Sequence, residues 1–144
     1  MWEFRFDICP VAASRPRVTR AGHTYYAGPY KNFRKEMDVQ IEERLGSFEV
    51  LDAPLCVELG CHITKPKTTK LWTPRADVDN YAKAVLDSLN GVVWEDDRQI
   101  TDLSITKGWT ESHEVPGWID IMIDIDRENY ENQDGTWRYI RYGS

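Results

Sequence analysis

The residues best suited to chemistry in this sequence lie in one short stretch. Asp77 and Asp79 are two positions apart, Lys83 follows four residues after Asp79, and three more acids stand together at residues 95–97. In a regular helix, residues two apart point to nearly opposite sides, whereas an extended segment leading into a helix directs them the same way. Because apolar periodicity starts only at about Val78, the spacing predicts that Asp77 and Asp79 converge where a loop becomes a helix.

Carboxylates clustered in this way repel one another, and a hard divalent cation such as Mg²⁺ is a partner that satisfies them. Mg²⁺ takes oxygen ligands, keeps waters for a substrate phosphate, and activates water as a nucleophile. Lys83, one turn from Asp79, would share its face and stabilise negative charge developing on the phosphate. Asn80 could orient a carboxylate or a water. A return of the chain after the helix could bring a third carboxylate from residues 95–97.

The same residues also admit a purely structural interpretation. Asp is a favoured N-cap and complements the helix dipole, so Asp77 or Asp79 could simply begin the helix. Asp79 and Lys83 could form an exposed pair that stabilises the helix by about 0.3 kcal/mol. The acids at residues 95–97 could belong to a solvated turn. Spacing alone leaves both interpretations open.

Six periodic segments must position these residues. Alternating apolar residues predict strands, and apolar residues three and four apart predict helices. The segments between them, residues 14–28 and 64–76, have the composition of loops, and Gly46 and Asn90-Gly91 are helix stops. The predicted strands are residues 2–8, 55–63, 101–109 and 118–125, and the predicted helices are residues 30–45 and 78–89.

This β-α-β-α-β-β order predicts an α/β (α+β) fold, with a mixed sheet and two main helices in a single domain. That domain covers residues 1–126. The tail from 127 to 144 is polar with scattered aromatic residues, a composition that fits either an ordered or a disordered segment.

Composition narrows the class of protein. The chain has 144 residues, of which 41% are hydrophobic and 29% charged, which is ordinary for one soluble globular domain. It has no apolar run near the roughly 20 residues of a membrane helix, and its N-terminus does not resemble a signal peptide. Cys9, Cys56 and Cys61 form no CxxC motif, so we expect reduced, partly buried thiols in a cytoplasmic protein.

The formal net charge of -6 opposes nucleic-acid binding, because phosphate neutralisation supplies most of the affinity of such proteins. The charges are segregated, however. Residues 15–35 and 65–75 contain basic residues and no acid. This predicts basic arms around an acidic centre, although two solvated loops would give the same pattern. The candidate DNA contacts are Arg15, Arg17, Arg20, Lys31, Arg34, Lys65, Lys67, Lys70 and Arg75, together with Trp72, which could stack on bases or could pack under its own loop.

The run DVDNYAKAVLDSLNGVVWEDD, residues 77–97, closely resembles the signature of RusA-like crossover junction endodeoxyribonucleases, the Holliday junction resolvases. The resemblance covers roughly residues 2–109. It implies that Asp77, Asp79 and Asp97 hold Mg²⁺ and that Lys83 is the catalytic lysine. Mn²⁺ could substitute for Mg²⁺, and Asp96, like Asn80, could support the site from outside the set of ligands. The acidic net charge and the tail after about residue 126 depart from the family pattern.

The resemblance also implies an activity and its partners. Members resolve four-way DNA junctions as homodimers, by paired symmetric nicks that use metal-activated water. A dimer makes physical sense, since one chain offers one carboxylate cluster and two symmetric cuts need two. The family occurs in bacteria and their phages, so we expect action in the bacterial cytoplasm and no membrane partner.

Two other functions are compatible with parts of the pattern. A junction-binding protein with a decayed nuclease would keep the basic segments, but the intact Asp77, Asp79, Asp97 and Lys83 speak against decay. A metal-dependent nucleotide phosphohydrolase would keep the acids, but two basic segments are excessive for so small a substrate. A cleavage assay on a four-way junction with Mg²⁺ would separate the three.

Overall fold

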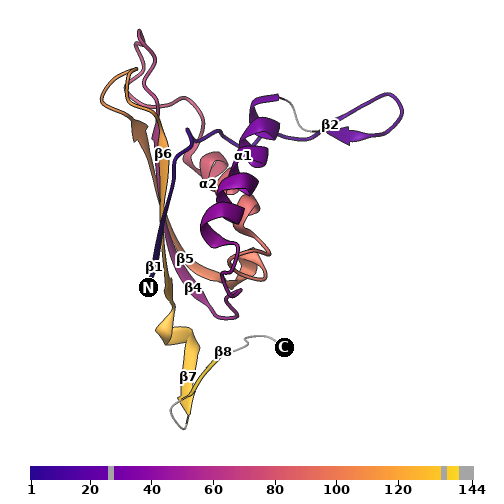
Figure 1. Ribbon diagram of the computed structural model, residues 1–144, viewed down its shortest axis with the longest axis vertical. Coiled ribbons are helices and arrows are strands. Elements are labelled where there is room, and N and C mark those ends of the chain that lie inside the picture. Colours follow the sequence, from indigo (N-terminus) through magenta and orange to yellow (C-terminus); the bar gives the residue numbers. More distant parts are fainter. Residues whose placement is uncertain (26–27, 134–135, 140–144) are drawn as a thin grey trace.

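The computed structural model describes residues 1–25, 28–133 and 136–139. One mixed sheet has the strand order β1-β6-β4-β5, in which β6 is antiparallel to β1 and β4, and β4 is parallel to β5. Both main helices lie on the same face of this sheet (Figure 1). The predicted mixed sheet with two helices is therefore confirmed. Its elements are β1 Trp2–Phe6, α1 Gly28–Leu45, β4 Leu55–Ile63, α2 Val78–Leu89, β5 Ile100–Trp109 and β6 Trp118–Ile125.

The core lies between the sheet and the helices. Alternation directs Ile119, Ile121 and Ile123 of β6 inward, and all three are buried. Their register partners on β4 are Cys61, Leu59 and Val57, so the inward rows of neighbouring strands coincide. From the helices, residues three and four apart complete the core, as the periodicity predicts. These are Tyr30, Phe33, Met37, Ile41 and Leu45 of α1, and Ala82, Val85 and Leu89 of α2.

Strands β4 and β5 are joined through α2, because parallel neighbours need a crossover rather than a hairpin. The segment of residues 64–76, which we call the basic loop, leaves the carboxyl end of β4 and leads into Asp77 and α2. On β5, alternation separates a polar row (Asp102, Ser104 and Thr106) from the row facing α2 (Leu103, Ile105 and Lys107). The helix thus runs beside the edge strand and makes a groove with it.

Several short elements were not predicted. Residues 14–28, interpreted as a loop, contain the hairpin of β2 (Arg17–Val18) and β3 (Thr24–Tyr25), which projects from the body (Figure 1). We call residues 14–25 the basic hairpin. Strands this short give no alternation to detect. The tail contains η2 (Arg127–Asn129) and a second hairpin of β7 (Tyr130–Gln133) and β8 (Thr136–Tyr139), while residues 134–135 and 140–144 lie outside the described part.

The structure also bears on the cysteines and on the absence of a predicted membrane helix. Cys9 and Cys56 are half-buried and Cys61 is buried, and all three are free. Burial raises the pKa of Cys61 to about 11, so this thiol stays protonated at neutral pH. Across the described residues, no helix is both long enough and apolar enough to cross a membrane.

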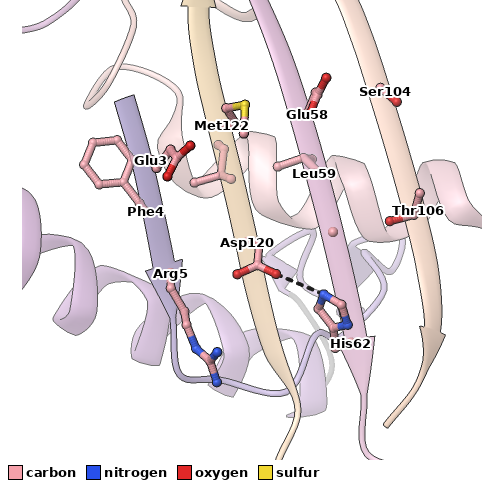
Figure 2. Close-up of a pocket in the computed structure, with 12 residues that line it drawn as sticks. Glu3, Phe4, Arg5, Glu58, Leu59, His62, Ser104, Thr106, Asp120 and Met122 are labelled. Atoms are coloured by element: carbon pink, nitrogen blue, oxygen red, sulfur yellow. Dashed lines mark hydrogen bonds and ion pairs between the residues drawn. The ribbon is translucent and has the colours of Figure 1, made fainter. Parts of the chain in front are cut away.

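The sheet face opposite the helices is polar and forms a shallow hollow of about 590 Å³ (Figure 2). Its side chains pair across strands. His62 Nε2 lies 3.0 Å from Asp120 Oδ2, and the His62 ring stacks on Trp118 at a centroid distance of 4.0 Å. The guanidinium of Arg5 lies 4.7 Å from the same indole. Such pairs stabilise a sheet face that meets water, so this hollow has a structural explanation.

Candidate functional site

Two of the three predicted metal-binding acids meet the predicted lysine beside α2. Asp79, Lys83 and Asp97 line one pocket of about 230 Å³, whose floor includes Leu103 and Ile105 of β5. Asp79 and Lys83 stand one turn apart on α2, and Asp97 comes from η1 (Asp97–Gln99), immediately before β5. The chain therefore returns after α2 and places a further carboxylate beside Asp79, as expected. Asp87, on the same stripe of α2, lines the pocket too.

Asp77 stands just outside this pocket, at the N-cap of α2. Its backbone is extended, with φ -66° and ψ 144°, and its carbonyl accepts hydrogen bonds from Asn80 N and Tyr81 N. Its carboxylate makes no capping hydrogen bond. The structural interpretation of Asp77 is thus right about its position but wrong about its side chain.

Asp97 is held in place from several sides. Its Oδ1 accepts a 2.7 Å hydrogen bond from Nε1 of the fully buried Trp94. Its backbone N–H donates to Asn90 Oδ1 at 2.9 Å. Asp96 caps η1 by accepting from Arg98 N, and Gln99 accepts from Asp96 N in return. Residues 94–97, the Trp-x-Asp-Asp end of the motif, therefore fix the position of the Asp97 carboxylate.

The turn between α2 and Trp94 depends on Gly91. Its φ of +79° lies in the left-handed region, which a side chain disfavours. The N–H of Gly91 donates to Trp94 O at 2.7 Å and closes the turn. Asn90-Gly91, predicted as a helix stop, thus ends α2 and also brings Trp94 and the Asn90 side chain to Asp97.

The electrostatics of the pocket favour a cation. Partial burial raises the pKa of Asp97, and the nearby carboxylates of Asp87 and Asp96 raise it further; the Trp94 hydrogen bond and the charge of Lys83 act in the opposite direction. Lys83 Nζ lies 3.2 Å from Asp87 Oδ2, and Lys83 remains 63% exposed. The lysine is therefore placed between acids on an open surface, where it could also reach a phosphate.

The residues of this pocket suit Mg²⁺. Among the described residues, no three His, Cys, Asp or Glu side chains already enclose a common point at ligand distance. Mg²⁺ does not need such a cage, because it is commonly held by one or two carboxylates, its own waters and substrate phosphates. Asp79 and Asp97 supply carboxylate oxygens at one pocket, and Asp77 supplies another at the adjoining helix end.

Both basic segments reach α2. A second hollow of about 350 Å³ adjoins the first, shares Lys83 and Asp87 with it, and is also lined by Ser14, Arg15 and Pro16. Ala13 N donates to Asn80 O at 2.9 Å, which fixes the base of the basic hairpin to the first turn of α2. The basic loop runs directly into Asp77. The basic hairpin thus meets the acids at a shared hollow, and the basic loop meets them along the chain at Asp77.

The candidate DNA contacts differ in how far they are exposed. Arg15, Arg17, Arg20, Lys31, Lys67, Lys70 and Arg75 are exposed, and Lys65 is half-buried. Trp72 is 90% exposed, so the idea that it packs under its own loop is wrong. Arg34 is half-buried and donates to Tyr30 Oη and to the carbonyl of Asp87, which braces α1 against α2.

Sequence reasoning missed several contributors. Asp87 could have been found from its four-residue spacing after Lys83, which continues the stripe begun at Asp79. Trp94 and Asn90 lie within the quoted motif, but only the fold shows that they bond Asp97. Lys107 gave no signal beyond being a charged residue at a position where alternation predicts an inward side chain.

Comparisons with known proteins identify the family of this chain. The family of the endodeoxyribonuclease RusA matches residues 7–123, which is most of the chain and includes every acid discussed above. A protein of Bacillus subtilis (strain 168), described as the uncharacterized protein YqaN, is 27% identical over 122 residues, covering 74% of this chain and 86% of the relative. The chain belongs to the RusA endodeoxyribonuclease family, and it is a nuclease of that class.

Proposed function

We propose that this protein is a Mg²⁺-dependent, structure-selective endonuclease that resolves four-way DNA junctions by paired symmetric nicks. The observation that carries the proposal is the meeting of Asp79, Lys83 and Asp97 in one pocket, with the basic hairpin at an adjoining hollow and the basic loop leading into Asp77. An acidic pocket alone would repel DNA. The neighbouring basic hairpin and basic loop offer phosphate contacts while leaving the acids free for a cation.

Asp77, Asp79 and Asp97 would hold the metal, and Mn²⁺ would substitute for Mg²⁺. When bound, the ion supplies a water of lowered pKa and offsets charge on the scissile phosphate. Asp97 is the most rigidly placed of the three, because Trp94 fixes its carboxylate and η1 fixes its backbone. Lys83, exposed on α2 beside Asp87, would donate to the phosphate oxygens or to the leaving oxygen.

The basic hairpin and the basic loop would contact phosphates on arms of the junction. Trp72, nearly fully exposed at a surface that meets DNA, would stack on a base at the branch point. Junction resolution needs two cuts related by symmetry, so we propose that the enzyme acts as a homodimer with one pocket per chain. Its setting would be DNA recombination or repair in the bacterial cytoplasm, with the gene carried by a bacterium, prophage or phage.

The deciding experiment is cleavage of a synthetic four-way junction labelled on each strand in turn. With Mg²⁺, nicks should appear at symmetric positions on two opposing strands, and EDTA should abolish them. A linear duplex of the same sequence is the control and should stay uncut. Robust cutting in EDTA would refute the metal mechanism. Binding of the junction without cutting in the presence of Mg²⁺ or Mn²⁺ would indicate a junction-binding protein. Hydrolysis of free nucleotides without cutting of DNA would indicate a phosphohydrolase.

A further inference from the structure

Lys107 makes two close contacts immediately before the predicted metal ligands. Its Nζ lies 2.7 Å from the carbonyl oxygen of Pro74 and 2.6 Å from that of Ala76. Ala76 is the last residue before Asp77, and Pro74 is buried. One ammonium group therefore donates hydrogen bonds to two backbone carbonyls at the end of the basic loop, directly before α2 begins.

The position of Lys107 is costly unless these contacts are made. It follows Leu103 and Ile105 on the row of β5 that faces α2, and it pairs in register with the buried Cys61. A charged group on a partly buried row loses hydration, so it needs hydrogen-bonding partners. Two carbonyl oxygens provide them, and an apolar side chain at this position would leave both oxygens without this donor.

Apart from Lys107, one tie within the described part of the chain holds the first turn of α2 from outside the loop that precedes it, the hydrogen bond from Ala13 N to Asn80 O at 2.9 Å. Asp77 occupies the N-cap, but its side chain makes no capping hydrogen bond. The basic loop is tied to β5 and the residue after it at two other points, by Trp109 Nε1 to Leu71 O at 3.1 Å and by Lys65 N to Thr110 Oγ1 at 3.1 Å. Leu71 and Lys65 are farther from Asp77 in sequence than Pro74 and Ala76, the two residues that Lys107 contacts.

The geometry points to Lys107 as a positioning residue that sets where Asp77 and Asp79 stand relative to Asp97. Asp97 is placed independently, by Trp94 and η1, so the two halves of the carboxylate set reach the pocket by separate routes. Lys107 connects the first half to β5, whose side chains form the floor of the pocket. This inference rests on the proposed function, because it assigns those carboxylates to a shared cation.

The test compares Lys107→Met, which keeps the length of the side chain but removes the donors, with Lys107→Arg, which keeps charge and donors. Thr106→Ala, on the polar face of the same strand, is the matched control. We expect Lys107→Met to cut a four-way junction about 10²-fold more slowly, since small misplacements of catalytic groups have effects of that size. It should also need several-fold more Mg²⁺ for half-maximal cutting and bind the junction normally in EDTA. Lys107→Arg should retain most of the activity.

A second measurement does not depend on activity. Asn80 N and Tyr81 N donate to Asp77 O in the first turn of α2, and their hydrogen exchange should accelerate in Lys107→Met but not in Thr106→Ala. The inference would be overturned if Lys107→Met changed neither the hydrogen exchange of these amides nor the Mg²⁺ requirement for cutting. It would also be overturned if Lys107→Met and Lys107→Arg lost cleavage activity equally and in proportion to a fall in melting temperature. If the wild-type protein fails to cut junctions while Lys107→Met still accelerates this exchange, the proposed function fails and the positioning role stands.

Discussion

Asp79 stands in the first turn of α2 with an exposed side chain, while Asp77 takes the N-cap position. Because Asn has nearly the shape of Asp, Asp79→Asn removes one charge and little else. We expect junction cleavage with Mg²⁺ to fall by at least about 10²-fold, since even outer partners of metal ligands have effects approaching that size. Junction binding in EDTA should persist or tighten, because one carboxylate fewer faces the phosphates. Cleavage and gel-shift assays on the same preparation check both.

The control for that variant is Asp38→Asn, which removes the same charge from an exposed position on α1 and should cut like the wild type. If Asp79→Asn also cuts at nearly the wild-type rate, Asp79 is only a surface residue of the helix. Lost cutting with retained binding is the result that supports a catalytic role.

Asp97 permits a prediction about stability and pH. Partial burial, and then the charges of Asp87 and Asp96, raise its pKa above the unfolded value of about 3.9. The folded state therefore holds the proton more tightly than the unfolded state does. Ionisation of Asp97 therefore destabilises the fold. This destabilisation is absent at a pH below the pKa of Asp97 in the unfolded chain, and it is complete at a pH above its pKa in the folded protein. Without metal at pH 7, Asp97→Asn should consequently melt at a higher temperature than the wild type.

The difference in melting temperature should shrink as the pH is lowered towards 3.9, and Mg²⁺ should stabilise the wild type more than the variant. Glu95→Gln, at an exposed position two residues earlier, should leave the melting temperature nearly unchanged. A lower melting temperature for Asp97→Asn in EDTA at neutral pH would mean that the carboxylate is already compensated within the protein.

At the scale of elements, the basic hairpin and the basic loop should act through phosphate contacts. Replacing Arg17, Lys67 or Arg75 singly by Ala should weaken junction binding. Each lost contact should make the slope of log affinity against log salt shallower by about one unit. Binding titrations over a range of NaCl concentrations measure this slope. An unchanged slope in all three variants would identify these segments as ordinary solvated loops.

Trp72 should behave differently, because stacking is not a charge interaction. Trp72→Ala should weaken junction binding by about 1–3 kcal/mol, the usual value of one base stacked on an aromatic side chain, and leave the salt slope unchanged. Trp72→Phe should recover part of the loss. Since this side chain is 90% exposed, neither variant should change the melting temperature, which serves as the control for folding. Equal junction affinity for all three proteins would remove Trp72 from the interface.

For the whole molecule, the proposed paired nicks require paired sites. Sedimentation at micromolar concentration should therefore give about twice the mass of one chain. A strict monomer that still nicks opposing strands symmetrically would contradict this expectation. The net charge of -6 belongs to this scale as well, because the acids lie outside the two basic segments, one of which lines a hollow next to the pocket. Local charge near the pocket, rather than the total, should govern DNA affinity.

The sequence by itself determined the main elements. Helices α1 and α2 and the four sheet strands follow from apolar periodicity, because each buries one stripe or one face, and that requirement acts within a few consecutive residues. The DxDN, lysine and Trp-x-Asp-Asp motif likewise indicated which acids to examine. The basic hairpin escaped this reasoning, since strands of two residues leave no periodic signal.

Tertiary structure decided what those residues contact. Asp79 and Asp97 are 18 positions apart in sequence, and only the turn at Gly91 and the return into β5 bring them to one pocket. The links from Lys107 to the carbonyls before Asp77 depend on where β5 lies beside the start of α2. Register and helix placement arise from packing of the whole core, a long-range property that no local pattern encodes.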